Sequence, residues 1–217
     1  MVADPRPLLT LTFMNDSFAL ASPAMKHPRT SPIRLSHRLA AAALLALIGA
    51  AVPAHATQYF TPGAVLTSFF KDATKITYKK LTLTDAEAEE IGKKLGTSAV
   101  KRDWSIYFSE TSGKRNDGFA ILDKELGMHE PIDFAVRFTA AGLVDGVEVM
   151  EYREAYGDEV RADRFRQQFF GKSAKDAITV GKDIQIITGA SISSRSMALG
   201  VKRWALVLES ALKNGRL

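Results

Sequence analysis

Residues 57–98 alternate between helical and strand patterns. Thr61-Pro62 precedes apolar residues at helical spacing, which predicts a short amphipathic helix with the threonine as its cap. Residues 76–83 alternate loosely between apolar and polar side chains and predict a strand. The TDAE sequence at 84–87 has the spacing of a capping box, so we expect a second helix that ends near Gly96.

Two hairpins are predicted next. Residues 104–108 and 119–125 have the composition of strands, and residues 113–118 between them are rich in Gly, Asn and Asp, which favour turns. Apolar residues then alternate with polar ones on both sides of Ala141-Gly142: Phe134, Val136 and Phe138 before it, and Val144, Val147 and Val149 after it. This alternation is typical of two half-buried antiparallel strands.

The segment 183–194 changes from a strand pattern to a helix pattern. Ile184, Ile186 and Ile187 are β-branched and apolar, which suits a half-buried strand. Beyond the segment, apolar residues recur along one face of a long helix: Met197, Val201, Trp204, Leu208 and Leu212. Because strands come mostly as hairpins, with helices at the ends, we expect an α+β fold: an antiparallel sheet of hairpins with flanking helices and a long C-terminal helix.

Residues 25–56 have the pattern of a secretory signal peptide. A basic segment precedes the apolar run 39–52, which is shorter than the ~20 residues a helix needs to span a bilayer, and Ala54-His55-Ala56 fits a cleavage site. We therefore divide the chain into an upstream extension (1–24), a signal peptide (25–56), a helix–strand–helix extension (57–98) and a main domain (99–217). This organisation predicts a periplasmic protein, or one on the outer face of the inner membrane.

Charge and cysteine content narrow the function classes. The formal net charge is +5, but five basic and two acidic residues precede residue 57, so the remainder carries only +2. That small excess gives no support for a nucleic-acid partner. The chain contains 0 cysteines, which excludes disulfides, Cys-ligated iron–sulfur clusters and haem attached through a C-x-x-C-H motif. A redox protein of this composition needs another cofactor, and flavin fits that requirement.

The start of the long helix is a candidate phosphate site. Gly189 allows the backbone to turn there, so the N–H groups that follow point outward at the positive end of the helix dipole. Four hydroxyl residues that could carry a phosphoester surround it: Thr188, Ser191, Ser193 and Ser194. We expect Thr188 at the end of the preceding strand and Ser194 a full turn into the helix, away from the free N–H groups.

The sequence Thr188-Gly189-Ala190-Ser191, with Asp183 upstream, resembles the attachment motif of the FMN-binding domain family. This family includes the flavin-carrying subunits of the Na⁺-translocating NADH:quinone reductase and Rnf complexes, and stand-alone exported relatives. The resemblance implies that a separate FMN transferase moves FMN from FAD onto Ser191 and recognises Asp183. Two departures are that the acceptor is Ser where the family usually has Thr, and that Asp183 stands five residues before Thr188, further than usual.

The resemblance extends over roughly residues 100–210. Residues 127–132 (GMHEPI) resemble the start of a hairpin in the family, G-x-H-x-P-I. Residues 152–160 resemble the family segment Y-R-E-x-x-G-x-E-V, which packs beside the flavin together with the helix after it. Position in these motifs implies that His129 and Glu154 lie near FMN. We expect the aromatic residues of the following helix, Phe165, Phe169 and Phe170, mainly in the core.

These observations predict an exported electron-transfer flavoprotein with FMN bound covalently to Ser191. The predicted cofactor-binding residues are Ser191, Thr188, Gly189, Ala190, Ser193, Asp183, Glu154 and His129. An electron carrier or redox-complex subunit is favoured over a self-contained enzyme, because no residue pattern demands a catalytic acid or base, and no metal site is predicted. The partners implied are the FMN transferase and a membrane or periplasmic redox protein.

Other interpretations of these residues stay open at this point. Ser191 or Ser193 could instead cap the helix, and His129 could be a structural hydrogen-bonding residue beside a proline turn. Glu154 could form a surface salt bridge with a neighbouring arginine, with Arg153, Arg164 and Arg195 as the candidates. Two alternative functions are a non-catalytic periplasmic adaptor that binds FMN weakly or not at all, and an exported serine hydrolase with His129 as its base, although the sequence lacks a G-x-S-x-G elbow.

Overall fold

The computed structural model describes residues 56–98, 100–111 and 114–217. The predicted upstream extension, and all of the predicted signal peptide except its last residue, therefore lie outside the described residues. No helix in the described part has both the length and the apolar character needed to cross a membrane.

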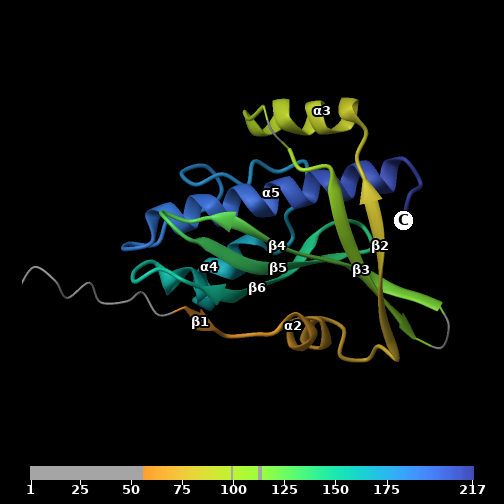
Figure 1. The fold of residues 1–217 in the computed structure, drawn as a ribbon, viewed down its shortest axis with the longest axis horizontal. Helices are drawn as coiled ribbons and strands as arrows, with labels where there is room; N and C mark the ends of the chain where they lie inside the picture. The colour runs from red at the N-terminus through yellow and green to blue at the C-terminus, as the bar shows by residue number, and fades with distance from the viewer. Residues whose placement is uncertain (1–55, 99, 112–113) are drawn as a thin grey trace, which may run out of the picture. The chain divides into compact units, whose positions relative to one another are not determined.

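A six-stranded antiparallel sheet forms the centre of the fold (Figure 1), in the order β1-β6-β5-β4-β3-β2. The strands are β1 (Thr57–Gln58), β2 (Lys75–Thr82), β3 (Asp103–Thr111), β4 (Lys114–Leu126), β5 (Pro131–Thr139) and β6 (Val144–Tyr152). The two predicted hairpins are β3–β4 and β5–β6, and in each the two strands pair directly with one another. The predicted α+β class with an antiparallel sheet is confirmed.

Helices cover both faces of this sheet, as Figure 1 shows. They are α2 (Pro62–Phe69), α3 (Asp85–Leu95), the short α4 (Asp163–Arg166) and the long C-terminal α5 (Ser191–Lys213), with two 3-10 turns, η1 (Asp158–Arg161) and η2 (Gln167–Phe169). The larger core lies between the sheet and α5, where Phe134 of β5 stacks on Trp204 at 4.3 Å between ring centroids. A smaller core lies under α2 and contains Val65, Phe69 and Met150.

The predicted caps are confirmed. Thr61 caps α2 by accepting a hydrogen bond from the N–H of Ala64, and Pro62 occupies the first helical position. Thr84 and Glu87 form the capping box of α3, and Gly96 ends that helix in the left-handed conformation. Residues 57–98 also contribute β1 and β2 to the main sheet, where they pair with β6 and β3.

The turn predicted at residues 113–118 is wrong from residue 114 onward, because β4 begins at Lys114, and residue 113 lies outside the described residues. The β3–β4 pairing shifts register between Phe108 and Ser109, so extra residues of β4 are accommodated inside the ladder. At Gly118, φ is +155° and a Cβ atom would lie 2.1 Å from the carbonyl oxygen of Phe138. The Gly, Asn and Asp residues of this segment therefore belong to an irregular strand, and Gly118 allows that strand to approach β5 closely.

The strand predicted before the long helix is also wrong. Residues 184–190 belong to no strand, and only an isolated bridge joins Ile184 to Val180. The side chain of Gln168 takes the place of a neighbouring strand, because its Oε1 accepts from the N–H of Gln185 at 2.6 Å and its Nε2 donates to the Gln185 carbonyl at 3.3 Å. Ile184 and Ile187 are buried nonetheless, since core packing needs no sheet partner.

The predicted aromatic stripe divides between core and surface. Phe165 and Phe169 are buried and meet edge to face, with ring centroids 5.3 Å apart. Phe170 is 47% exposed, because the helical turn has ended by then and the chain bends toward the edge of β6, where the N–H of Gly171 donates to the Val144 carbonyl. The expectation is therefore correct for two of the three residues.

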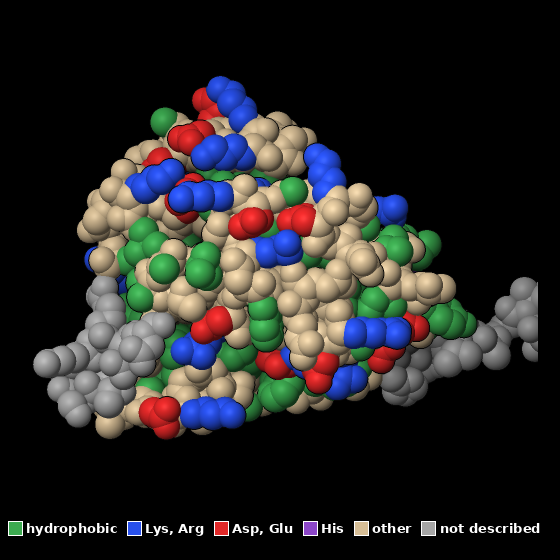
Figure 2. All heavy atoms as spheres, turned by 180° about the vertical axis from the view of Figure 1, so that it is seen from behind, with side chains coloured by type: hydrophobic (Ala, Val, Ile, Leu, Met, Phe, Trp, Pro, Cys, Tyr) green, Lys and Arg blue, Asp and Glu red, His purple; other side chains and the backbone are tan. Residues whose placement is uncertain are grey.

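Charges are mixed on the face of the molecule seen in Figure 2. Lys and Arg side chains stand beside Asp and Glu side chains there, and no large patch of one sign is visible. The described residues also include close pairs within α3, such as Lys93 with Glu89 and Lys94 with Glu90, each at 2.8 Å. This distribution agrees with the small net charge calculated for the chain from residue 57 onward.

Candidate functional site

Helix α5 begins with unpaired backbone N–H groups. The first N–H that joins the helical ladder is that of Ser194, which donates to the Ala190 carbonyl at 2.8 Å. Within the described part of the chain, no hydrogen bond is formed by the N–H groups of Ser191, Ile192 or Ser193. Three free donors at the positive end of a 23-residue helix are suited to bind an anion.

The turn before α5 depends on Gly189. Its φ is +88°, and a Cβ atom there would lie 3.2 Å from a carboxylate oxygen of Glu159. A larger residue would be strained in this conformation and would press against η1. Glycine therefore lets the backbone turn at the helix start without a side chain against Glu159.

The three serines at the start of α5 differ in accessibility. Ser193 is 3% exposed and Ser194 is fully buried, whereas Ser191 is partly exposed. None of them caps the helix, because the N-cap residue is Ala190 and, among the described residues, no side chain bonds to the free N–H groups. The alternative interpretation of Ser191 or Ser193 as a cap is therefore wrong. Of these three serines, Ser191 is the one that a large reagent can reach.

A cavity of about 540 Å³ opens beside Ser191. Three segments far apart in the sequence surround it: the β4–β5 turn, the segment after β6, and the start of α5. The lining residues are Met128, His129, Glu130, Arg153, Glu154, Ala155, Tyr156, Gly157, Gly189, Ala190, Ser191, Ile192 and Ser193. Six of the eight predicted cofactor-binding residues are thus brought together around one space.

Glu154 joins two of these segments. Its Oε1 accepts hydrogen bonds from the N–H groups of His129 and Glu130, at 2.7 and 3.1 Å. In the described part of the chain Glu154 forms no ion pair, so the alternative interpretation of a surface salt bridge with a neighbouring arginine is wrong. The carboxylate instead fixes the β4–β5 turn against the segment after β6. His129 lines the cavity and is held there by the hydrogen bond from its backbone N–H to Glu154.

Tyr152 lies behind two residues that line the cavity, Ser193 and Gly157. The phenol of Tyr152 donates to the Tyr156 carbonyl at 2.6 Å and lies 2.8 Å from Oγ of Ser193. Burial is the main cause that raises the pKa of Tyr152, and nearby carboxylates add to it against the lowering effect of Ser193. The phenol therefore stays protonated and can donate its hydrogen bond to the Tyr156 carbonyl. Gly157, with φ of +98°, leaves the space that these two hydroxyls occupy.

Asp183 and Thr188, the other two predicted site residues, lie outside the cavity lining. Asp183 accepts from the N–H groups of Ile178 and Thr179, at 3.0 and 2.8 Å, and from the ammonium of Lys172 at 3.1 Å. Burial acts to raise the pKa of Asp183, but these hydrogen bonds together lower it. Thr188 lines a separate cavity, next to Ile187. Asp183 thus organises the loop that leads to the motif.

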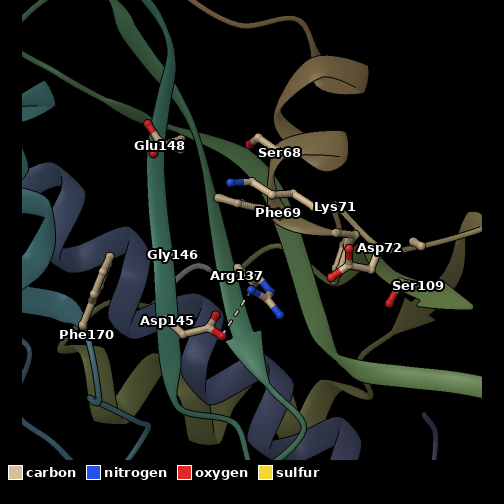
Figure 3. A pocket seen from close by; sticks show the side chains of 12 residues that line it. Ser68, Phe69, Lys71, Asp72, Ser109, Arg137, Asp145, Gly146, Glu148 and Phe170 are labelled. Carbon is tan, nitrogen blue, oxygen red and sulfur yellow. Dashed lines mark ion pairs between the residues drawn. The ribbon is translucent and has the colours of Figure 1, made fainter. Parts of the chain in front are cut away.

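A different cavity, of about 460 Å³, lies beside the end of α2 and is drawn in Figure 3. Lys71 and Arg137 both line it, and Arg137 forms a long ion pair with Asp145 at 3.5 Å. It shares no lining residue with the cavity at Ser191. Its polar, mixed-charge walls contain none of the predicted site residues.

The residues around Ser191 fit a flavin nucleotide. The volume lies within the usual range for cofactor pockets, roughly 300–1,000 Å³. Met128, Ala155 and Ile192 supply the apolar surface that a ring system needs, and the free N–H groups of α5 supply the phosphate site. No cluster of His, Cys, Asp and Glu suited to a metal ion occurs in the described residues.

Sequence patterns missed several residues of the site. Tyr152 is the last residue of β6, at a position where the strand pattern predicts a core residue. Only its hydrogen bonds in the structure distinguish it from an ordinary core residue. Met128, Tyr156 and Ile192 are large apolar residues that are 57%, 85% and 42% exposed. Their signal in the sequence is weak, since each stands alone among polar or small residues.

Comparisons with known proteins find similarity to one family. Residues 127–206 match the model of the FMN-binding domain. The chain is 33% identical over 110 residues to a subunit of the proton-translocating ferredoxin:NAD⁺ oxidoreductase complex of Clostridium ljungdahlii, covering 47% of this chain and 57% of the relative. It is 24% identical over 136 residues to a subunit of the Na⁺-translocating ferredoxin:NAD⁺ oxidoreductase complex of Acetobacterium woodii, covering 58% of this chain and 66% of the relative. The chain thus spans less than two thirds of either relative.

Among solved structures, the crystal structure of Shewanella oneidensis NqrC resembles this chain with a TM-score of 0.44 and 14% identity. The alignment covers 66% of this chain and 83% of that structure.

Proposed function

We infer that this chain, whose residues 127–206 belong to the FMN-binding domain family, is an electron-transfer flavoprotein with FMN attached through a phosphoester to Ser191. Its relatives are named as subunits of ferredoxin:NAD⁺ oxidoreductase complexes, and such complexes move electrons between carriers. The observation that carries the attachment is the accessible hydroxyl of Ser191, placed between the cavity and three unpaired N–H groups.

The bound flavin supplies the electron-transfer chemistry, and the protein holds and orients it. The N–H groups at the start of α5 stabilise the phosphate through hydrogen bonds and the helix dipole. Met128 and Ile192 offer apolar surface on which the ring system would pack, and Glu154 holds the β4–β5 turn in place beside the cavity. No residue of the site is required to donate or remove a substrate proton.

Attachment requires a separate FMN transferase. Oγ of Ser191 would form the new bond to phosphorus, the pyrophosphate bond of FAD would break, AMP would leave, and the serine proton would pass to solvent. Ser193 is a poorer acceptor because it is 3% exposed and bonded to Tyr152. Ser194 is enclosed completely.

The proposed location is the periplasm or the outer face of the inner membrane, and it rests on the signal-peptide pattern at 25–56. Covalent attachment suits such a location, where lost FMN is not easily replaced. We propose a membrane redox complex as the partner, because both relatives are named as subunits of cation-translocating complexes. The intact mass of host-purified protein should correspond to a chain that begins near Thr57; a mass that includes residues 26–56 would contradict export with cleavage.

Absorbance and mass together test the flavin assignment. Protein purified from its host, or co-produced with an FMN transferase, is expected to be yellow and to keep its flavin absorbance after acid precipitation. Its mass should exceed that of the chain by on the order of 440 Da, the mass of FMN less water. A colourless protein after co-production would contradict the flavoprotein function and support the adaptor. Colour that dissociates in acid would contradict only the covalent bond.

The serine hydrolase receives no support from the site. In the described residues no hydrogen bond joins His129 to Ser191 or Ser193, and the hydroxyl of Ser193 is engaged by Tyr152. A nucleophilic serine needs an adjacent base to remove its proton. A fluorophosphonate probe is expected to leave the protein unlabelled.

A further inference from the structure

A cavity of about 400 Å³ lies where α5, the end of α3 and the loop residues 177–180 meet. None of its lining residues also lines the flavin cavity. Its walls combine three cationic side chains, Lys94, Arg195 and Lys202, with apolar residues that include Leu95, Ile178 and Leu199. Among the described residues, no acidic one lines it.

The cationic side chains are only partly neutralised by the protein. Lys94 pairs with Glu90 at 2.8 Å. Arg195 is exposed, and its side chain forms no hydrogen bond or ion pair with any residue in the described part of the chain. The guanidinium is thus available for a ligand, and its planar arrangement of N–H groups suits a carboxylate or phosphate.

Lys202 adds a second cation, which is partly buried. Its ammonium donates to the carbonyl oxygens of Ala174, at 2.8 Å, and Asp176, and it forms no ion pair with described residues. Burial is the main cause that lowers the pKa of Lys202, while the carboxylates of Asp176, Asp183 and Glu209 act in the opposite direction. An anion beside this ammonium would offset the cost of holding a positive charge away from water.

The apolar wall is built by a constrained loop. Ile178 has φ of +44°, an unusual value for a β-branched residue, and is only 2% exposed. Asp183 accepts hydrogen bonds from the N–H groups of Ile178 and Thr179. The ammonium of Lys202 donates hydrogen bonds to the carbonyl oxygens of residues 174 and 176. Two independent anchors therefore fix the wall beside the cations, so little ordering of the loop is needed on binding.

We propose that this cavity binds an amphipathic anion, with a carboxylate or phosphate head on Arg195 and Lys202 and one aliphatic chain along Leu95, Ile178 and Leu199. An inorganic anion would leave the apolar wall uncovered, and an uncharged hydrocarbon would desolvate the cations without a partner. Only a molecule with both an anionic head and an aliphatic chain contacts the cationic and the apolar residues of the lining. The site does not depend on the flavin, because the two cavities share no residue of α5.

Calorimetric titration of the full chain with decanoate tests the proposal. Decanoate is expected to bind with one-to-one stoichiometry, whereas decanol and acetate at the same concentrations should not. Arg195→Gln should weaken binding about tenfold, as expected for one charge-assisted contact. Lys93→Gln, next to the cavity residue Lys94 but paired with Glu89, is the matched control and should bind normally. Equal binding of decanol, or unchanged affinity in Arg195→Gln, would overturn the proposal.

A second variant and vesicles complete the experiment. Leu199 is 38% exposed, so Leu199→Asn should fold, keep its flavin and still lose affinity for decanoate. Vesicles of phosphatidylglycerol and of phosphatidylcholine distinguish the source of the anion. Binding to the former that disappears in Arg195→Gln assigns the site to a membrane lipid, while decanoate binding without vesicle binding assigns it to a soluble amphiphile. If neither decanoate nor phosphatidylglycerol binds, the proposal is wrong.

Discussion

The hydroxyl oxygens of Tyr152 and Ser193 lie 2.8 Å apart in the interior, across 41 residues of sequence. This contact links the end of β6 to the first turn of α5, and it leaves Ser193 with a structural role. The hydroxyl of Ser191, two residues earlier and on a more open side of the helix, has no hydrogen bond to another described residue. The relationship separates two serines that look alike in the sequence.

The first prediction concerns the attachment residue. With a compatible FMN transferase, Ser191→Ala should lose the mass increment completely, because the other serine that lines the cavity, Ser193, is buried. Ser193→Ala should keep the increment while losing about 1 kcal/mol of stability with its hydrogen bond. Intact mass and thermal unfolding measure the two effects. Peptide mapping that places FMN on residue 193 would show the assignment to be wrong.

The second prediction concerns Gly157. A Cβ atom there would lie 2.5 Å from Oη of Tyr152 and 2.7 Å from Oγ of Ser193, so Gly157→Ala should break this contact. We expect a loss of about 2–4 kcal/mol from the combined clash and backbone strain, with lower flavin loading. Gly171→Ala is the control, because Gly171 also has positive φ but no atom within 4 Å of a Cβ. Equal stability losses in the two variants would mean that the clash is unimportant.

The third prediction separates two roles of Asp183. In Asp183→Asn one carboxylate oxygen becomes an amide group, which cannot accept from the Ile178 N–H or pair with Lys172. If Asp183 acts through its loop, stability and flavin loading should fall together, the former by about 1–3 kcal/mol. Chemical denaturation and intact mass are measured on the same samples. Lost loading at unchanged stability would instead assign Asp183 to recognition by the transferase.

The fourth prediction concerns the carboxylate that joins two walls of the cavity. Glu154→Ala removes the acceptor for the N–H groups of His129 and Glu130, so the β4–β5 turn should loosen and flavin loading should slow several-fold. Glu154→Gln keeps an amide oxygen in the same place and should load at close to the normal rate. The time course of the mass increment is the measurement. Identical rates for both variants would contradict this role.

The fifth prediction is a pH dependence that arises at Glu87. Burial acts to raise the pKa of this residue, but bonds from Thr84 and Ser210 and the charge of Arg216 outweigh it and lower the pKa from its ordinary 4.5 to about 2. A lowered pKa in the folded state means that the stabilisation is present above pH 4.5 and is lost as the pH falls toward 2.

Glu87→Gln should therefore flatten part of the fall in stability over this acid range, measured as unfolding free energy against pH. The matched control is Glu89→Gln, a residue whose side chain is 67% exposed and whose partner is Lys93 on the same helix. A control curve that flattens equally would show that Glu87 contributes nothing specific.

The wrong predictions at residues 113–118 and 184–187 have a common physical cause. Residues 184–187 have a strand composition, yet the side chain of Gln168 forms the hydrogen bonds to the backbone of Gln185 that a strand partner would form. No residue near 184–187 in the sequence indicates this contact. At residues 113–118 the turn-forming composition is local, but the pairing of β4 with β3 and β5 extends the strand through it. Local pattern reports the preference of a segment, while pairing depends on which segments meet in the fold.

The amino-acid sequence by itself determined the fold class, the caps of α2 and α3, the long final helix and the motif around Gly189, because each depends on residues within a few positions of one another. Only the tertiary structure decided which of the two serines that line the cavity has a free hydroxyl, and which groups enclose the cavity. Ser191 and Ser193 are chemically equivalent along the chain, and they differ because β6 brings Tyr152 to one of them. Glu154 is likewise an ordinary acidic residue until the fold places two N–H groups from the β4–β5 turn beside it.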